Sequence, residues 1–194
     1  MVVKDESQFI GDAIASAAPI VDEVVVVDTG SVDETVDIAR RAGARVFRAR
    51  WPGDLGKAHQ LPLDHAHGDW VLALDADEAL DPGSRGRIPE LLDVGDVEGY
   101  RLAIRNYSYV YTEKWRWCDP THPFARGTPG FLPTRVVRLF RRRPAYRYSG
   151  MLHQTMEPAI VALGGRVADA DVAIHHYGFL RTDKLKGELY VRLA

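Results

Sequence analysis

The sequence predicts an α/β fold with a mainly parallel central sheet. Strand-like and helix-like stretches alternate from the N-terminus to about residue 80, the pattern of strands joined by helical crossovers. The stretch "DEVVVVDTGS" is a continuous β-branched run, as expected of a strand buried on both faces. With 194 residues, 46% of them hydrophobic, the chain is long enough to bury its own core. We therefore expect a single domain over residues 1–194.

The elements of the first half follow from local patterns. A short strand at the N-terminus precedes a helix in "DESQFIGDAIASAAPI", which Pro19 ends. After the strand "DEVVVVDTGS", the stretch "SVDETVDIARRAGA" predicts a helix with Ser31 as N-cap, Glu34 completing a capping box and Gly43 at its C-terminus. Next come a strand, "ARVFRARW", and a helix, "GKAHQLPLDHAHG", in which Pro62 is unfavourable. The fourth strand is "DWVLALDADE".

The second half has a different pattern. "EGYRLAIRNYSYVYTE" and "TRVVRLFRRRPAYRYSG" alternate like strands, with a Pro/Gly-rich loop at residues 118–133 between them. "GRVADADVAIHHYGF" adds a further strand or pair of strands. These stretches predict a β extension beside the parallel sheet.

Composition narrows the class of protein. The net charge of −2 gives no general case for binding nucleic acid. The single cysteine, Cys118, excludes an internal disulfide framework and fits a reducing, cytoplasmic location. No stretch approaches the roughly 20 apolar residues of a transmembrane segment. An arginine run from Arg135 to Arg147 indicates a solvated strand end, while a peripheral position at the inner face of a membrane is left open.

The two ends of the sequence suggest a chain that extends further. Only Met1 to Val3 precede the first charged residue, which is short for a strand, and "KLKGELYVRLA" stops in a helical pattern without a cap. We therefore expect that the sequence is truncated at both ends.

Three predicted strands end in polar clusters, the last of which contains Asp75, Asp77 and Glu78. Carboxylates held this close repel one another, so the cluster needs either open water or a cation. In an extended chain Asp75 and Asp77 would point the same way, about 7 Å apart, a span that suits a divalent cation with a diphosphate. Because parallel α/β sheets bind ligands at the carboxyl ends of their strands, three clusters on one edge favour the cation.

These residues resemble those of a known family. "VVKDE", "VDEVVVVDTGSVDET" and "GDWVLALDADE", in this order, are similar to the nucleotide-sugar-binding half of family 2 glycosyltransferases, specifically the group with "VVDTGS" after the second strand. "RLFRR", "YSGMLHQ" and "IHHYGF" resemble acceptor-side elements of the family. The resemblance implies the GT-A fold, a three-layer α/β/α arrangement. Residues 1–82 would form the nucleotide-sugar-binding half and residues 83–194 the acceptor-binding half.

The resemblance also implies a metal site. Asp75 and Asp77 fall on the DxD motif, in which the second acid binds Mn²⁺ or Mg²⁺ bridging the donor diphosphate. His176 matches a histidine near the metal or pyrophosphate. Because His175 and His176 are neighbours on a predicted strand, only one can point into the site. Asp75, Asp77 and His176 are therefore the expected metal-site residues, and Asp77 the main ligand.

Contacts to the rest of the donor follow from the same resemblance. Glu6 and Asp28 fall where the family holds the base and ribose, and Lys4 belongs to the same strand-end clusters. The family's "ARN" reads Ala58-His59-Gln60 here, so an arginine contact to phosphate is in doubt.

The catalytic base is the other departure. The family's "HE" reads His153-Gln154, and a glutamine cannot act as a general base. Glu157 is the nearest substitute and our expected base. An alternative makes Glu157 the start of a helix with Pro158 at its first position.

Together these observations predict a metal-dependent, inverting glycosyltransferase. It would move a sugar from a nucleoside-diphosphate sugar to the hydroxyl of an unidentified glycan, lipid-linked or peptide acceptor. One alternative is a non-catalytic nucleotide-sugar-binding protein, suggested by Gln154 and His59. Another is a phosphoaspartyl phosphatase, although that class carries its hydrophobic-DxD signature on the first strand rather than at Asp75.

Overall fold

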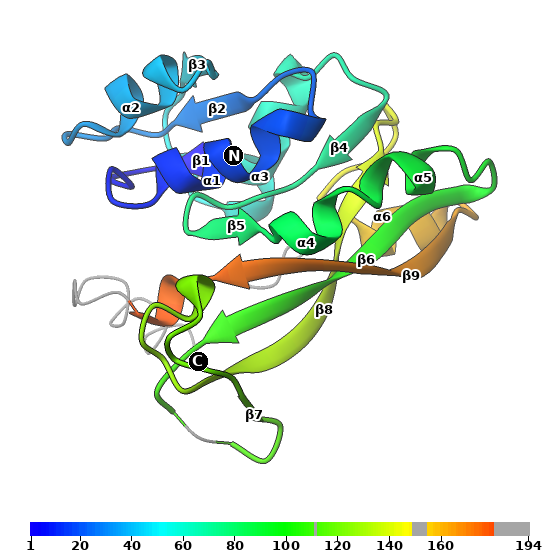
Figure 1. Ribbon diagram of the computed structural model, residues 1–194. Coiled ribbons are helices and arrows are strands. Elements are labelled where there is room, and N and C mark those ends of the chain that lie inside the picture. The colour runs from blue at the N-terminus through cyan, green and yellow to red at the C-terminus, as the bar shows by residue number, and fades with distance from the viewer. Residues whose placement is uncertain (111, 149–154, 181–194) are drawn as a thin grey trace.

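The computed structural model describes residues 1–110, 112–148 and 155–180 (Figure 1). In this part of the chain the strands form two sheets, with helices packed between and around them. The first sheet is parallel, in the order β1-β2-β3. Its strands are β1 (Val2–Val3), β2 (Val25–Asp28) and β3 (Arg45–Arg48). Val3 pairs with Asp28, so β1 and β2 end side by side.

The second sheet is mixed, in the order β4-β8-β6-β9-β5, and β7 pairs with β8 at one side. Its strands are β4 (Trp70–Leu72), β5 (Glu78–Leu80), β6 (Val97–Tyr107), β7 (Arg116–Trp117), β8 (Gly130–Arg141) and β9 (Arg166–His176). Among the strand pairs of this sheet that the structure describes, only β6 and β9 run parallel. The expected parallel sheet therefore covers the first three strands, whereas "DWVLALDADE" joins the mixed sheet through an antiparallel pairing of β4 with β8.

The helices are mostly short. They are α1 (Ile10–Ala17), α2 (Thr35–Arg41), α3 (Leu55–His65), α4 (Pro82–Arg85), α5 (Ile88–Leu92) and α6 (Glu157–Ala162), with 3₁₀ turns η1 (Ala18–Ile20), η2 (Pro123–Ala125) and η3 (Gly178–Leu180). Helix α3 continues through Pro62, although a proline inside a helix removes one backbone hydrogen bond. Among the residues of these described ranges, no helix is long and apolar enough to cross a membrane.

The predicted capping box of α2 is wrong. Helix α2 begins at Thr35, whose N–H donates to the Asp33 carboxylate. The Ser31 hydroxyl instead accepts a hydrogen bond from the Asp5 N–H, across the gap between the loops that follow β1 and β2. Gly43 does end the helix in the left-handed conformation, with φ of 87°.

Helix α1 connects the two parts of the core. Ile10 and Ile14 pack against the first sheet, in a cluster with Val26. Ala13 and Ala17, on its other side, pack into the larger cluster of the second sheet. The two sheets thus share one helix and are held together by apolar contacts.

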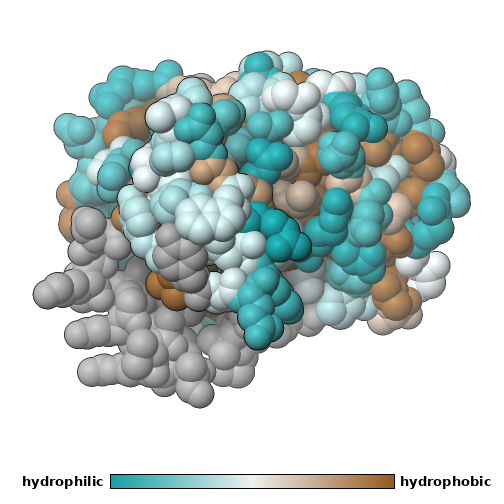
Figure 2. All heavy atoms as spheres, turned by 60° about the horizontal axis from the view of Figure 1, so that its bottom comes forward, coloured by the Kyte–Doolittle hydropathy of each residue, from teal (hydrophilic) through white to brown (hydrophobic). Residues whose placement is uncertain are grey.

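Figure 2 shows the surface turned so that the bottom of Figure 1 comes forward. Hydrophilic and hydrophobic residues are mixed over the part of this face that grey atoms do not cover.

Candidate functional site

The acidic segment lies in a loop and not in a strand. Strand β4 ends at Leu72, and the chain turns before β5 begins at Glu78. The Asp75 N–H donates to Glu78 Oε2 at 2.9 Å, and the Glu78 N–H donates to the Asp75 carbonyl at 3.1 Å. These reciprocal bonds close a tight loop. The expectation that Asp75 and Asp77 point the same way along a strand is therefore wrong, because a turn separates them.

Two of the three acids share one arginine as their partner. Arg138 of β8 donates through Nη2 to Asp75 Oδ2 at 3.0 Å and to Glu78 Oε1 at 2.7 Å. The Glu78 side chain is only 2% exposed and that of Arg138 16%. Burial alone would raise the pKa of Asp75, but the Arg138 guanidinium lowers it below its usual range. Burial raises the pKa of Glu78, and Arg138 opposes this shift. Asp75, whose side chain is 36% exposed, is thus an ion-pair partner of Arg138.

Asp77 points to a different partner, His176. Strands β5 and β9 are antiparallel and pair Glu78 with His176, and the Tyr177 N–H donates to the Asp77 carbonyl at 2.9 Å. This pairing brings Asp77 Oδ1 to 3.8 Å from His176 Nε2. Their side chains are 14% and 22% exposed. His175, the neighbour, is fully buried, so the alternation expected for the two histidines is confirmed.

A glycine leaves space beside this pair. A Cβ atom on Gly178 would lie 2.6 Å from His176 Nε2 and 3.1 Å from Asp77 Oδ2. The contact at 2.6 Å is too short for two atoms, so any side chain at this position would displace the His176 ring, and it would also crowd the Asp77 carboxylate. A carboxylate oxygen and an imidazole nitrogen therefore share a space that only glycine keeps open.

The chemistry of this pair fits a divalent cation shared with a ligand. In the described part of the chain, no three His, Cys, Asp or Glu side chains are grouped closely enough to hold a metal ion by themselves. Mg²⁺ is commonly bound through one or two carboxylates together with substrate phosphates and water. Asp77 supplies one such carboxylate with the His176 imidazole beside it, whereas the Asp75 carboxylate is paired with Arg138.

The expected nucleoside contacts lie at the ends of β1 and β2. Glu6 and Asp28 are buried, while Lys4 is exposed. The Glu6 N–H donates to Thr35 Oγ1 at 2.7 Å, and Asp28 Oδ1 accepts from the Ser31 N–H at 3.0 Å. The first bond links the loop after β1 to the start of α2, and the second lies within the loop after β2. Asp77 and His176 belong to another group, built on β5 and β9.

Glu157 is placed far from this group. It is the first residue of α6, and its carboxylate pairs with Arg101 of β6, with Arg101 Nε 2.9 Å from Oε2. Arg101 is five residues from Asn106, the β6 residue that contacts His176, or about 16 Å along the strand. This placement argues against Glu157 as the base and favours the helix-start alternative. His153 and Gln154 lie outside the described residues.

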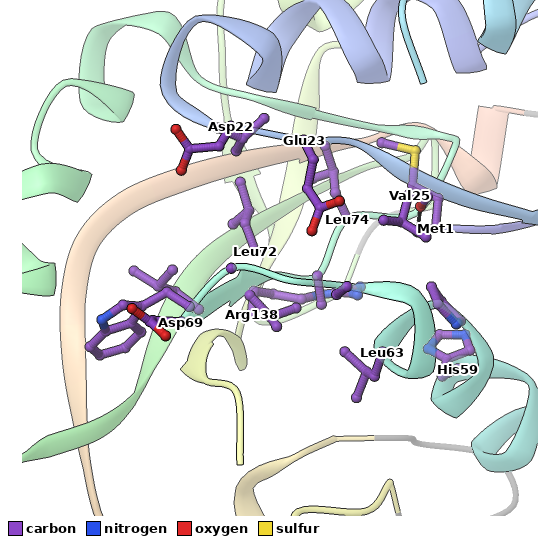
Figure 3. A pocket seen from close by; sticks show the side chains of 18 of the residues that line it. Met1, Asp22, Glu23, Val25, His59, Leu63, Asp69, Leu72, Leu74 and Arg138 are labelled. Atoms are coloured by element: carbon purple, nitrogen blue, oxygen red, sulfur yellow. Dashed lines mark hydrogen bonds between the residues drawn. The ribbon is translucent and has the colours of Figure 1, made fainter. Parts of the chain in front are cut away.

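A pocket of about 360 Å³ lies between the first sheet, α3 and β4 (Figure 3). Most of its wall is apolar. His59 of α3 and Arg138 of β8 line it together with Asp75 and Tyr148. Burial lowers the pKa of His59, against the opposing effect of Asp75. His59, which stands where the resemblance expects an arginine, therefore lies near the acidic loop without a hydrogen bond to it.

Sequence reasoning missed two residues of the site. Arg138 belongs to the arginine run that the sequence places at a solvated strand end, yet it lies between the buried Val137 and Leu139, and it pairs with the buried Glu78. The signal in the sequence is the apolar stretch "VVRLF" around it, because such a run is typical of a strand buried on both faces. Asn106 contacts His176 Nδ1 at 2.7 Å, and nothing in the sequence around it indicated this.

The chain is similar to proteins of known families. The family model described as glycosyl transferase family 2 matches residues 1–150. A TPR repeat-containing protein of Synechococcus elongatus is 30% identical over 193 residues, which are 96% of this chain and 43% of that protein. The lipopolysaccharide core biosynthesis glycosyltransferase LpsC of Rhizobium meliloti is 34% identical over 120 residues, 58% of this chain and 44% of LpsC. The chain thus spans less than half the length of these relatives.

Two solved structures share the architecture. Glucosyl-3-phosphoglycerate synthase of Mycobacterium tuberculosis, in complex with Mn²⁺ and UDP-glucose, is 17% identical with a TM-score of 0.57, over 99% of this chain and 74% of that one. Residues 1–349 of TarS from S. aureus, in complex with UDP-GlcNAc, are 16% identical with a TM-score of 0.58, over 90% of this chain and 56% of that one. These similarities confirm the expected GT-A fold, an α/β fold that here contains a mixed sheet.

Proposed function

Because the chain belongs to glycosyl transferase family 2, we propose that it moves a sugar from a nucleoside-diphosphate sugar to an acceptor hydroxyl with inversion. We further propose that Mn²⁺ or Mg²⁺ takes part and is held by Asp77 and His176. The family assignment argues against the alternative that the protein is a phosphoaspartyl phosphatase. A cytoplasmic location remains a prediction from the single cysteine.

The pairing of Asp77 with His176 carries the proposal. Their side chains come within 3.8 Å of each other, beside a glycine whose replacement would fill the space between them. A bound cation would offset the negative charge that develops on the nucleoside-diphosphate leaving group. Asp77 would supply an anionic oxygen to that position, and His176 would supply a nitrogen.

The remaining donor contacts have distinct proposed roles. Asp28 and Glu6, buried at the ends of β1 and β2, are proposed to hold the nucleoside. Lys4, exposed at the same edge, is proposed to face the phosphates. Asp75, which the resemblance placed in the metal site, instead fixes the loop that presents Asp77, because Arg138 and the Glu78 carboxylate hold both of its polar ends.

Metal-dependent nucleotide binding tests this proposal. Both structural neighbours described above were solved with UDP-sugars, so UDP is the first nucleotide to try. A ligand at many times its Kd stabilises the folded protein by RT ln(1 + [L]/Kd), and we expect UDP with Mn²⁺ to raise the Tm by several degrees. The same rise in the presence of EDTA would contradict the metal role.

A matched pair of variants locates the site. Asp77→Asn should lose the Mn²⁺-dependent part of the shift and abolish transfer without unfolding the protein. Asp171→Asn makes the same chemical change at a side chain that is 86% exposed, and should behave as wild type. Nucleotide binding without transfer to any acceptor of a glycan, lipid-linked and peptide panel would favour the alternative of a non-catalytic binding protein.

A further inference from the structure

Asn106 connects three strands behind the Asp77–His176 pair. It lies near the end of β6 and is 8% exposed. The strand registers place it opposite Leu132 of β8 on one side and His176 of β9 on the other. Its amide nitrogen donates to the Leu132 carbonyl at 2.8 Å and to Thr134 Oγ1 at 3.1 Å. Its Oδ1 lies 2.7 Å from His176 Nδ1.

These contacts fix which way the amide faces. The Leu132 carbonyl has no hydrogen to donate, so the –NH₂ group of Asn106 must face it. The amide oxygen is then turned toward His176, and an oxygen can only accept. The hydrogen bond at 2.7 Å therefore requires that His176 Nδ1 carry a hydrogen.

We propose that Asn106 is a positioning residue that sets the tautomer of His176. With the hydrogen on Nδ1, the neutral imidazole carries its lone pair on Nε2, the nitrogen 3.8 Å from Asp77 Oδ1. That is the nitrogen a cation at Asp77 would need. The inference rests on the proposed function for its consequence, because the tautomer matters only if His176 binds the metal.

The arrangement is specific to an amide. A carboxylate at position 106 would accept from His176 equally well, but it would place an oxygen against the Leu132 carbonyl. A leucine has the same number and branching of side-chain heavy atoms, in a somewhat larger volume, without any polar contact. Partners that orient metal-binding histidines typically contribute 10- to 100-fold to metal affinity. Leucine at this position should therefore preserve the sheet and weaken the metal site.

The tautomer can be observed directly. Long-range ¹H–¹⁵N spectra distinguish the two imidazole nitrogens, and at about pH 8 an ordinary histidine, with a pKa of about 6.5, is neutral. The wild-type signal is assigned with a His176→Gln variant. We expect His176 to be in the Nδ1–H form without any metal, and to lose this preference in Asn106→Leu. A wild-type signal from the Nε2–H form, or an unchanged signal in the variant, would overturn the inference.

Mn²⁺ affinity, measured by calorimetry in the presence of UDP, then separates the two proposals. A 10- to 100-fold weaker affinity in Asn106→Leu, with the circular dichroism spectrum of the wild type, supports both. A tautomer change with unaltered Mn²⁺ affinity would leave the role of Asn106 in place and remove His176 from the metal site. The wild-type spectrum decides the tautomer even if the leucine variant does not fold.

Discussion

His175 and His176 show how adjacent identical residues acquire opposite roles. Their side chains leave β9 on opposite faces, as on any strand. His176 faces Asp77, whereas His175 is fully buried between Tyr107 Oη, 2.8 Å from Nδ1, and Asp81 Oδ1, 3.1 Å from Nε2. His175 is thus a structural residue in a buried polar chain, and its position gives it a measurable effect on stability.

We expect acid to destabilise the protein through His175. Burial lowers the pKa of His175 to about 4, against the opposing effect of Asp81. In the unfolded chain the histidine pKa is about 6.5, so between about pH 4 and pH 6.5 the unfolded state binds a proton that the folded state does not bind. The contribution is therefore fully present above about pH 6.5 and is lost as the pH falls toward 4, by up to about 3 kcal/mol.

Urea unfolding at several pH values from 7 to 4 checks this expectation. His175→Gln should flatten the fall in the free energy of unfolding over this range. His67→Gln, at a side chain that is 77% exposed, should keep the wild-type dependence. Parallel curves for wild type and His175→Gln would show that His175 is not the group responsible.

At the scale of elements, the loop between β4 and β5 depends on a strand far away in sequence. Asp75 and Glu78 bond to each other's backbone groups, and Arg138 of β8 holds both carboxylates. Without the guanidinium, the buried Glu78 carboxylate and the partly exposed Asp75 carboxylate would face each other unpaired. The loop that presents Asp77 is therefore stabilised from the second half of the chain.

Arg138→Met should lower the free energy of unfolding by about 3 kcal/mol or more, as expected when one partner of a buried ion pair is removed. Adding Glu78→Gln should restore part of this loss, because the amide removes one of the two repelling charges. The coupling between the two changes is read from a double-mutant cycle in urea. Arg135→Met, at an exposed position on the same strand, should cost less than about 1 kcal/mol. Additive effects of Arg138→Met and Glu78→Gln would show that the ion pair between Arg138 and Glu78 is not energetically important.

At the scale of the whole molecule, the two sheets do not divide where the sequence pattern changes. Strands β4 and β5 precede Pro82, yet they pair with β8 and β9 in the second sheet. Leu80 is fully buried in the cluster that contains Leu102. The proposed nucleotide-sugar-binding and acceptor-binding halves, residues 1–82 and 83–194, are therefore interleaved, which supports a single domain.

We expect a fragment of residues 1–82 not to fold alone. It would carry β4 and β5 without their partner strands and would expose the apolar face that Leu80 belongs to. Thermal melting followed by circular dichroism should show a cooperative transition for the whole chain and none for the fragment. A cooperative fragment that binds UDP would show that the first half is an independent unit.

The sequence by itself determined the local features of this protein. Alternating patterns located the long strands β6, β8 and β9, and the β-branched run located β2. The ordered motifs also indicated the family to which the chain belongs. These features depend on neighbours along the chain, which a sequence displays directly.

Only the tertiary structure decided what each acid does. Asp75 meets Arg138 across 63 residues, Glu157 meets Arg101 across 56, and Asp77 meets His176 through the register of β5 with β9. A sequence shows three similar carboxylates in these stretches. Strand pairing places Asp75 beside an arginine of β8, Glu157 beside an arginine of β6 and Asp77 beside a histidine of β9. The charge next to each carboxylate therefore depends on which strand lies beside it.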